Sequence, residues 1–394
     1  MITRRAVWAL AVAETVVWAG TLYIFPALLI HWEADLGWSK TTLAGAFTLA
    51  VLISAAAAPL AGRLIDTGHG VRLMTIGTLA AGGLVGMLAL VHAVWQFYAV
   101  WALIGVAAAA CLYEPCSAFL IRTQGADARR VLTQITLVTG FASALAFSGA
   151  NAVAEVWGWR TAVLVFGAVM LFVAAPLFHV GGRAADSSDP GDIRAGAGRS
   201  GSGALRAAVR RPAFWLLGAA FSMIALSHGV LITHLLPMLA ERGVATGVAV
   251  LAASGIGPMQ VVGRLAMMSV ERRVSMNAVC GLSFALMIAA MIALIQAGAE
   301  PWLLAGFVVL QGAGYGVTAI TRPVVAATVL GREGFGAVSG ALALPFVTAS
   351  AVAPTLAAAV WTIGGYDMVR SGLLVVLGIA AVSFFLAVAS SRRS

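Results

Sequence analysis

Twelve apolar stretches, each about twenty residues long or longer, occupy most of this chain of 394 residues. About twenty consecutive apolar residues are what an α-helix needs to cross the hydrocarbon core of a bilayer. Within a few residues at each end, the stretches lie at 6–30, 42–61, 73–92, 97–121, 131–153, 161–180, 213–236, 244–263, 274–296, 302–328, 336–361 and 371–390. Apolar residues make up 61% of the chain and charged residues 10%, which excludes an ordinary soluble domain. The pattern predicts an all-α polytopic membrane protein with twelve transmembrane helices.

Basic residues are distributed unevenly between the two sets of connecting loops. Lys and Arg stay on the cytoplasmic side during membrane insertion, so their distribution marks the orientation of the chain. One set of loops carries most of them, whereas the other holds Lys40, Arg160, Arg242 and Arg370. With twelve spans, both termini are expected in the cytoplasm, in the cytoplasmic (inner) membrane of a bacterium. The same asymmetry accounts for the net charge of +9 without a nucleic-acid partner.

Residue types that bind metals or nucleotides form no motif in this sequence. The three cysteines lie inside apolar stretches, and the six histidines show no metal-ligand spacing. No phosphate-binding loop occurs, which argues against an ATP-driven pump. We therefore expect no cofactor, no metal and an ion or substrate gradient as the energy source. An enzyme would need a paired nucleophile and base, and a sensor would usually carry an added soluble domain; the sequence shows neither.

One long hydrophilic segment divides the spans into six and six. Residues 181–211 are rich in Gly, Ser, Asp and Arg and bury too little apolar surface to fold alone. We expect a cytoplasmic linker there, between an N-terminal six-helix bundle at 1–180 and a C-terminal one at 212–394.

The two halves carry matching sequence features. Gly-Arg-Leu at 62–64 recurs at 263–265, and a charged residue followed by proline at 114–115 recurs at 322–323. These pairs share offsets of a little over 200 residues, which indicates an internal duplication.

The connection between the second and third spans carries the most specific motif, Gly62-Arg63-Leu64-Ile65-Asp66-Thr67-Gly68-His69-Gly70-Val71-Arg72. It resembles the signature loop of the major facilitator superfamily, and the resemblance covers essentially the whole chain. The family fold implied is two pseudo-symmetric six-helix bundles, with a gating role for Gly62, Asp66 and Arg72. A glycine at 62 permits close helix approach, and Asp66 can cap a helix end or pair with an arginine. A basic residue is usual in the family where Thr67 stands.

A narrower resemblance points to one branch of the family. Leu36-Gly37-Trp38-Ser39 before the second span, and Pro59 to Leu64 at its end, resemble the bacterial monocarboxylate and oxalate/formate-like branch. This resemblance implies proton-coupled symport of monocarboxylates. The drug-antiporter branch usually carries Gly-Pro in the fifth span, and the segment at 140–149 contains no proline.

Four ionisable side chains inside the spans are functional candidates, because each is costly to place in a bilayer. Glu14 lies in the first span, Glu114 in the fourth, His228 in the seventh and Arg322 in the tenth. The family resemblance implies that these four spans line the central cavity.

Glu114 and Arg322 occupy matching places in the two halves. They lie eight and ten residues before the arginines at 122 and 332, which places both roughly 12 to 15 Å inside the cytoplasmic ends of their helices. Each precedes a proline, which removes a backbone donor and can kink the helix. We expect Glu114 and Arg322 to pair across the halves when the cytoplasmic side is closed, with an anionic substrate competing for Arg322. The alternative is a permanent structural pair.

Proton coupling is assigned to Glu14 or Glu114, since removal from water favours the protonated form of a carboxyl group. For Glu14 the alternative is a hydrogen bond to a nearby backbone or hydroxyl group. His228 is a substrate candidate, although a lone histidine in a helix is often a packing residue.

Three tyrosines complete the candidate substrate site, namely Tyr23, Tyr113 and Tyr315, since a phenol binds through its hydroxyl while its ring packs. Most membrane tyrosines only anchor or pack. Glycines at 312, 314 and 316 are expected to permit close helix packing. The tryptophans at 32, 38, 157, 159 and 302 are expected to form an interfacial belt.

The function expected from these features is secondary active transport by alternating access, as a monomer in the lipid bilayer. The expected partners are a small organic anion, resembling a monocarboxylate, and protons. The alternative within transport is proton-coupled efflux of a drug-like or metabolite molecule, in which Arg322 serves only the gate.

Overall fold

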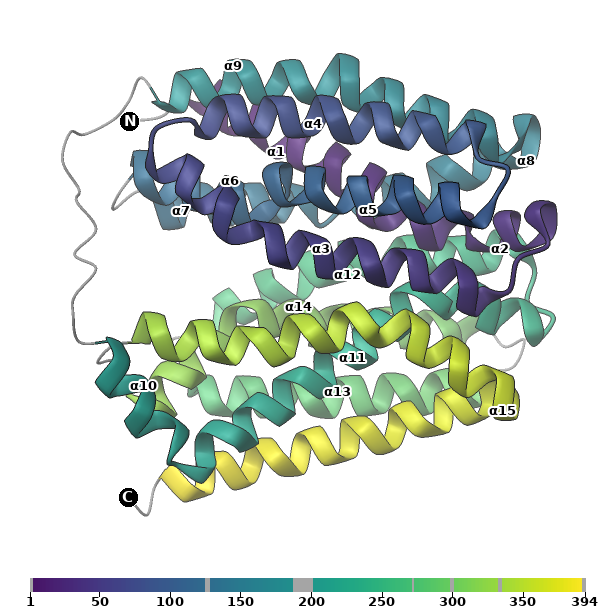
Figure 1. Cartoon of the computed structure of the whole chain (residues 1–394). Coiled ribbons are helices and arrows are strands. Elements are labelled where there is room, and N and C mark those ends of the chain that lie inside the picture. The colour runs from purple at the N-terminus through teal and green to yellow at the C-terminus, as the bar shows by residue number, and fades with distance from the viewer. Residues whose placement is uncertain are drawn as a thin grey trace. The chain divides into compact units, whose positions relative to one another are not determined.

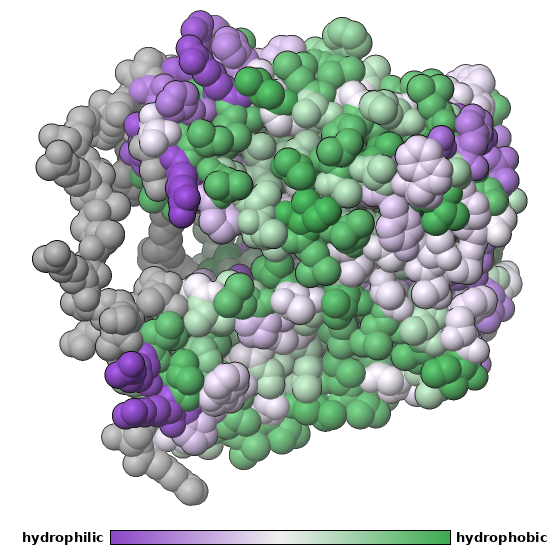
Figure 2. All heavy atoms as spheres, viewed as in Figure 1, coloured by the Kyte–Doolittle hydropathy of each residue, from purple (hydrophilic) through white to green (hydrophobic). Residues whose placement is uncertain are grey.

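The computed structural model of the chain describes residues 3–124, 128–186, 201–270, 273–297, 301–331 and 335–391. Ten helices among these residues are long and apolar enough to cross a membrane. The chain divides into two compact units, Met1–Ala195 and Gly196–Ser394 (Figure 1). On the face shown in Figure 2, hydrophobic residues cover most of each unit, and hydrophilic residues gather toward the helix ends. Such large exposed apolar surfaces are typical of a protein solvated by lipid.

The N-terminal unit contains nine α-helices and three short irregular turns among the described residues. In chain order they are α1 (Arg4–Trp18), a π-helical turn (Ala19–Tyr23), α2 (Ile24–Leu36), α3 (Lys40–Asp66), α4 (Gly70–Met87), a 3-10 turn (Leu88–Leu90), α5 (Val94–Cys111), α6 (Tyr113–Gln124), α7 (Ala128–Thr139), α8 (Ala142–Val169), a second π-helical turn (Met170–Ala174) and α9 (Ala175–Asp186). Gly37 ends α2 in the left-handed conformation, and the Ser39 hydroxyl caps α3 by accepting from the Thr42 amide at 3.1 Å. Local signals therefore define the first interhelical turn.

The C-terminal unit contains six helices among the described residues. They are α10 (Gly201–Val209), α11 (Pro212–Glu241), α12 (Thr246–Val270), α13 (Met276–Gln296), α14 (Pro301–Leu330) and α15 (Phe335–Ser391). Pro212 opens α11, where its missing amide hydrogen costs nothing, and the Ser275 hydroxyl caps α13.

Two helical stretches, Arg130–Asp186 and Val338–Ser391, contain 57 and 54 residues. Each is more than twice the length that one crossing needs, and each is broken at a glycine. Gly158 has φ +83° inside the first, and Gly365 has φ +65° inside the second. Glycine suits this left-handed backbone. Dividing each stretch into two spans at its glycine yields the twelve expected spans, and that division stays a prediction.

The expected linker at 181–211 contains helical residues at both ends. α9 continues to Asp186, and α10 occupies Gly201–Val209, whereas residues 187–200 lie outside the described part of the chain. Ala208 of α10 is buried together with Phe214 and Val338. The second half of the segment is helical because its apolar side packs against the C-terminal unit.

The expected tryptophan belt is only partly correct. Trp157 and Trp302 are exposed by 67% and 69%, as a belt requires. Trp32 is fully buried and Trp159 is 5% exposed, so these two belong to the core of the N-terminal unit. The Trp32 ring lies 5.2 Å from that of Phe97 of α5, and the Trp159 indole of α8 donates to Asp35 of α2 at 2.9 Å. These tryptophans are buried because partners from other helices cover them.

Glycines bring α12 and α14 into close contact, as their spacing predicts. A Cβ at Gly316 would lie 2.6 Å from the Gln260 Cα, and one at Gly312 would lie 2.7 Å from the Ile256 carbonyl oxygen. At Gly314 it would lie 3.0 Å from the Ser283 carbonyl oxygen of α13. The obstructing atoms are backbone atoms, which cannot rotate away. Only glycine fits at this crossing.

Gly316→Ala is therefore expected to lower the stability of the C-terminal unit by about 1 to 3 kcal/mol, the usual cost of overpacking. The measurement is thermal unfolding of the detergent-purified protein. Gly306→Ala is the matched control, because a Cβ at Gly306 of the same helix meets nothing within 4 Å. Equal melting temperatures for the two variants would contradict the close crossing.

Candidate functional site

Glu14 is the most deeply buried candidate in the N-terminal unit. It lies in α1 with 0% exposure. The Cys116 thiol of α6 lies beside its carboxyl group, and Glu114 lies within electrostatic range. Neither carboxyl oxygen of Glu14 has a hydrogen-bond partner of good geometry among the described residues. An uncompensated carboxylate there would cost several kcal/mol, so the protonated acid is the form that fits.

Glu114 and Tyr113 lie where the fourth span breaks. α5 ends at Cys111, Leu112 is extended with ψ −173°, and α6 begins at Tyr113. Pro115 causes the break, because it cannot donate to the Cys111 carbonyl and its ring crowds that carbonyl. Glu114 is exposed and Tyr113 half-buried. The expected proline effect is confirmed, and it interrupts the helix rather than only bending it.

Tyr23 lies at the end of the first π-helical turn. Its ring centroid is 6.2 Å from that of Trp18 and 6.3 Å from that of Phe147. A Cβ at Gly20 would overlap the Met170 side chain, so the two π-helical turns of this unit pack together. The extra residue in a π turn rotates the helix that follows it. Glu14 lies before this turn and Tyr23 at its end, so their directions around the helix axis differ from those in an uninterrupted α-helix.

The signature loop between α3 and α4 is held by α6. Arg122 Nη1 donates to the Ile65 carbonyl at 2.9 Å, and Gly68 takes the left-handed conformation with φ +87°. Arg72 is exposed in the first turn of α4. Asp66 ends α3, and its side chain lies outside the described part of the structure.

Gly62 does not make the close helix contact expected of it. A Cβ built there would meet no described atom within 4 Å. The close approach occurs instead at Gly70, where a Cβ would lie 2.7 Å from the Phe119 ring. The motif contains Gly62, but the packing of α4 on α6 determines that the close contact is made at Gly70. The gating role of the loop stays a prediction.

In the C-terminal unit, α11 and α14 bring His228 and Tyr315 together. Their rings are nearly parallel, with centroids 3.4 Å apart and an interplanar angle of 12°. Both residues are half-buried, and His228 Nδ1 is a buried atom with no hydrogen-bond partner among the described residues. Two candidates that are 87 positions apart in the sequence thus form one aromatic stack.

Arg322 lies seven residues after Tyr315 on α14. Its guanidinium carbon is 3.9 Å from the centroid of the Phe346 ring of α15. Arg322 and Arg264 both act electrostatically on the Tyr315 hydroxyl, and Arg264 Nε donates to the Gly316 carbonyl at 3.1 Å. α14 continues through Pro323, unlike the fourth span at Pro115. The matching prolines of the two halves therefore have different effects.

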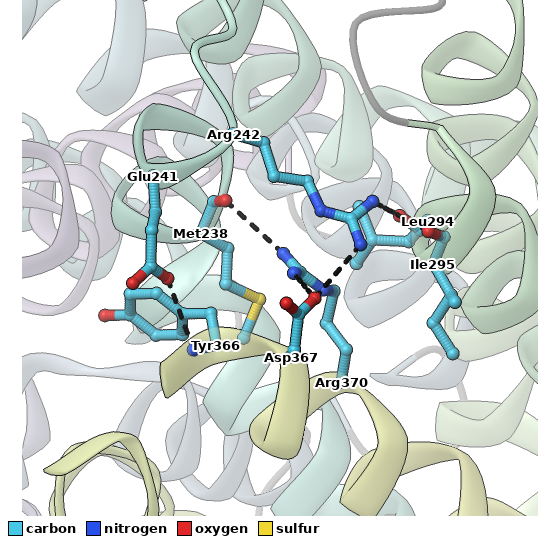
Figure 3. Close-up of polar contacts among 8 residues, drawn as sticks. All are labelled: Met238, Glu241, Arg242, Leu294, Ile295, Tyr366, Asp367 and Arg370. Atoms are coloured by element: carbon cyan, nitrogen blue, oxygen red, sulfur yellow. Dashed lines mark hydrogen bonds and ion pairs between the residues drawn. The ribbon is translucent and has the colours of Figure 1, made fainter. Parts of the chain in front are cut away.

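A polar network at the other end of the C-terminal unit joins α11, α13 and α15 (Figure 3). Arg242 donates to the Ile295 carbonyl at 2.7 Å and contacts Asp367 at 3.2 Å. Asp367 also pairs with Arg370, whose side chain is almost fully buried. Hydrogen bonds from Arg370 and then Arg242 lower the pKa of Asp367, which lies outside the predicted spans. The network fastens the glycine break of α15 to the ends of α11 and α13.

Asp367→Asn is expected to lower the melting temperature at pH 7 by a few degrees, because it leaves the buried Arg370 without its anion. The effect is modest because the Asp367 side chain is 82% exposed. Since folding lowers this pKa, the stabilisation is present above the ordinary pKa of 3.8 and is lost as pH falls through the folded value. The difference between the proteins should therefore shrink in acid. Glu241→Gln, which can still accept from the Tyr366 amide, is the control.

Two glutamines are buried in the C-terminal unit, although they carry no charge that would mark them in the sequence. Gln311 of α14 is 1% exposed and Gln260 of α12 is 7% exposed. Gln311 precedes Tyr315 by four residues, so helical periodicity around the tyrosine would have found it. All three cysteines are free and buried, and no group of three or more His, Cys, Asp or Glu among the described residues is arranged to hold a metal.

Known proteins resemble the chain in sequence profile and in fold. The profile of the Major Facilitator Superfamily matches residues 10–299. A bacterial homolog of the human lysosomal transporter Spinster, in an inward-facing and unoccupied conformation, has a TM-score of 0.74 at 13% identity, covering 98% of this chain and 97% of that chain. The nucleoside transporter NupG has a TM-score of 0.68 at 12% identity, covering 98% of both chains.

No curated protein sequence matches the chain. At these identities the solved structures establish the fold, and the sequence profile, which matches well over half of the chain, establishes the family. The protein is a multi-pass membrane transporter that belongs to the Major Facilitator Superfamily.

Proposed function

We propose that the protein is a proton-coupled symporter of a small organic anion, with monocarboxylates as the substrate class. It works by alternating access, as a monomer with twelve spans and cytoplasmic termini in the inner membrane of a bacterium. Its family supports transport as the general activity. Direction, coupling ion and substrate are parts of the proposal.

The position of Arg322 is the observation that supports an anionic substrate. It lies in a helix apolar enough to span the membrane, with its guanidinium group over the Phe346 ring and near Tyr315. The planar fork of a guanidinium group matches a carboxylate through two parallel hydrogen bonds. Tyr113 and Tyr23 of the other half are proposed as further substrate contacts.

The burial of Glu14 supports proton coupling. Its carboxyl group is fully buried and has no hydrogen-bond partner of good geometry among the described residues, so it is most stable in the protonated form. Glu114 lies on the neighbouring helix within electrostatic range, which disfavours a second negative charge. When the site opens to water, Glu14 can release its proton. Glu114 is the alternative carrier.

The test is uptake of labelled monocarboxylates into proteoliposomes, with and without an inward proton gradient. Wild-type protein should accumulate the anion only with the gradient. Arg322→Ala should lower uptake by at least about tenfold, since a charge-assisted hydrogen bond contributes roughly 1.5 to 3 kcal/mol. Arg273→Ala, at an exposed arginine in a loop, is the matched control.

Anion uptake that is unaffected by Arg322→Ala would contradict the proposed substrate contact. Proton-driven movement of apolar or cationic compounds, with no anion carried, would instead favour efflux of drug-like molecules.

A further inference from the structure

The C-terminal unit contains several buried polar atoms that the proposed function does not use. Gln311 Oε1, Gln260 Nε2, His228 Nδ1 and Ser227 Oγ have no hydrogen-bond partner among the residues that the structure describes. A buried polar group without a partner costs about 1 to 3 kcal/mol. Such groups are rare in folded proteins, and each needs a physical explanation. A bound polar ligand would satisfy several of them at once.

One of these side chains, Gln311, shares a face of α14 with Tyr315 and Arg322. Gln311, Tyr315 and Arg322 are separated by four and then seven residues, the spacing of one helical face. At 1.5 Å per residue, the face extends about 16 Å from the first Cα to the last. The second glutamine belongs to α12, and its Cα abuts Gly316, the residue after Tyr315 and about 100° around the helix from it. An amide, a flat ring and a cation therefore follow one another along the helix.

The middle of this face has an aromatic geometry that suits a planar ligand. Tyr315 and His228 are stacked face to face at 3.4 Å and 12°, so each ring covers one face of the other, and a ligand ring can stack only on an outer face of the pair. Both side chains are only half-buried, which leaves part of the surface open. Aromatic rings attract one another in offset-stacked or edge-to-face arrangements, beyond the effect of the area that they bury, and a puckered saturated ring does not gain this attraction.

The two ends of the face have complementary polar chemistry. The Arg322 guanidinium favours a carboxylate. At the other end, glutamine amides both donate and accept, so Gln311 and Gln260 suit a hydroxyl group, which does the same. Small aliphatic monocarboxylates would contact Arg322 but leave the aromatic surface and both amides without a partner.

We propose that the C-terminal half binds a planar aromatic monocarboxylate with a polar ring substituent: Arg322 holds the carboxylate, the ring extends the stack of Tyr315 and His228, and Gln311 and Gln260 bind the substituent. This inference rests on the proposed function and names the substrate class of the same site. Gln311 and Gln260 are the residues that determine specificity.

The experiment measures uptake of a labelled monocarboxylate into proteoliposomes while an unlabelled carboxylate competes with it. The four competitors are 4-hydroxybenzoate, benzoate, cyclohexanecarboxylate and lactate. Cyclohexanecarboxylate has the carbon skeleton of benzoate without its planarity, so the comparison isolates stacking. Benzoate should compete better than cyclohexanecarboxylate by about three- to tenfold. 4-Hydroxybenzoate should compete better than benzoate by about tenfold, because it satisfies the buried amides.

Variants assign these preferences to residues. Gln311→Leu should remove the preference for 4-hydroxybenzoate over benzoate, and Tyr315→Leu should remove the preference for benzoate over cyclohexanecarboxylate. Gln296→Leu, at an exposed glutamine that ends α13, is the matched control and should keep both preferences. Uptake of lactate by Gln311→Leu and Tyr315→Leu would show that these proteins are folded. Loss of the preference can then be attributed to the substituted side chain.

Two results would overturn the inference in distinguishable ways. If lactate is carried with dependence on Arg322, and benzoate and cyclohexanecarboxylate compete equally, the aromatic substrate class is wrong and the proposed anion symport stands. If no carboxylate is carried, or a nucleoside is carried independently of Arg322, both the inference and the proposed function fail.

Discussion

Glu14→Gln is expected to abolish proton-driven accumulation of the substrate while leaving substrate binding and exchange in place. Glutamine has nearly the shape of the protonated acid, so the buried position in α1 can hold it without a new cavity or charge. Its amide cannot take up and release a proton near neutral pH. With one proton per substrate, wild-type protein can maintain about a tenfold substrate gradient for each unit of pH difference. The variant should reach a ratio of one.

Two assays on the same proteoliposomes separate coupling from binding. The first measures accumulation under an imposed pH gradient, and the second measures exchange of labelled against unlabelled substrate without one. Glu155→Gln is the control, because Glu155 is an exposed acid whose contact with Asn151 an amide can keep. Continued accumulation by Glu14→Gln would exclude it as the carrier. Loss in Glu114→Gln alone would transfer the role to Glu114.

Reversing the charge of Glu114 or of Arg322 is expected to have the second large effect on substrate uptake. If the two residues pair when the cytoplasmic side is closed, Glu114→Arg and Arg322→Glu each place like charges opposite one another. Like charges in a poorly solvated place repel strongly, so each single variant should keep less than about a tenth of the wild-type uptake. The double variant restores opposite charges and should recover at least part of it.

The double variant must exceed both single variants, measured as uptake normalised to the amount of reconstituted protein. Equal activity of the double and single variants would exclude the pairing. Single variants that transport normally would exclude it as well. Arg322→Gln, which removes the charge without reversing it, separates loss of a substrate contact from repulsion at the gate.

Residue types and spacing were sufficient to find the acids and bases that matter most. Glu14, Glu114, His228 and Arg322 were recognisable because a charged or titratable group inside an apolar stretch is costly, so chance rarely leaves it there. The structure confirms that Glu14 is completely buried. It places Glu114 within electrostatic range of Glu14 and Tyr315 against His228, as neighbours that no spacing rule relates.

Other features required the packing of several helices. The matching prolines at 115 and 323 look equivalent in the sequence, yet one span is broken and the other is continuous. Gly62 belongs to the signature loop, yet the close contact lies at Gly70. The buried glutamines at 260 and 311 carry no charge, so they do not stand out in an apolar stretch as ionisable residues do, although burying an amide group without a hydrogen-bond partner is costly.

By itself, the sequence determined the membrane-spanning helical class, the family and the few ionisable groups within the apolar stretches, and it predicts a duplication of the two halves. These properties depend on the length, hydropathy and order of single segments, which are summed along the chain. Only the tertiary structure decided which side chains meet: Glu14 beside Cys116, Tyr315 stacked on His228, and Trp32 buried while Trp157 is exposed. Those contacts depend on how neighbouring helices rotate and cross, which hydropathy does not encode because it is the same whichever way an apolar helix turns.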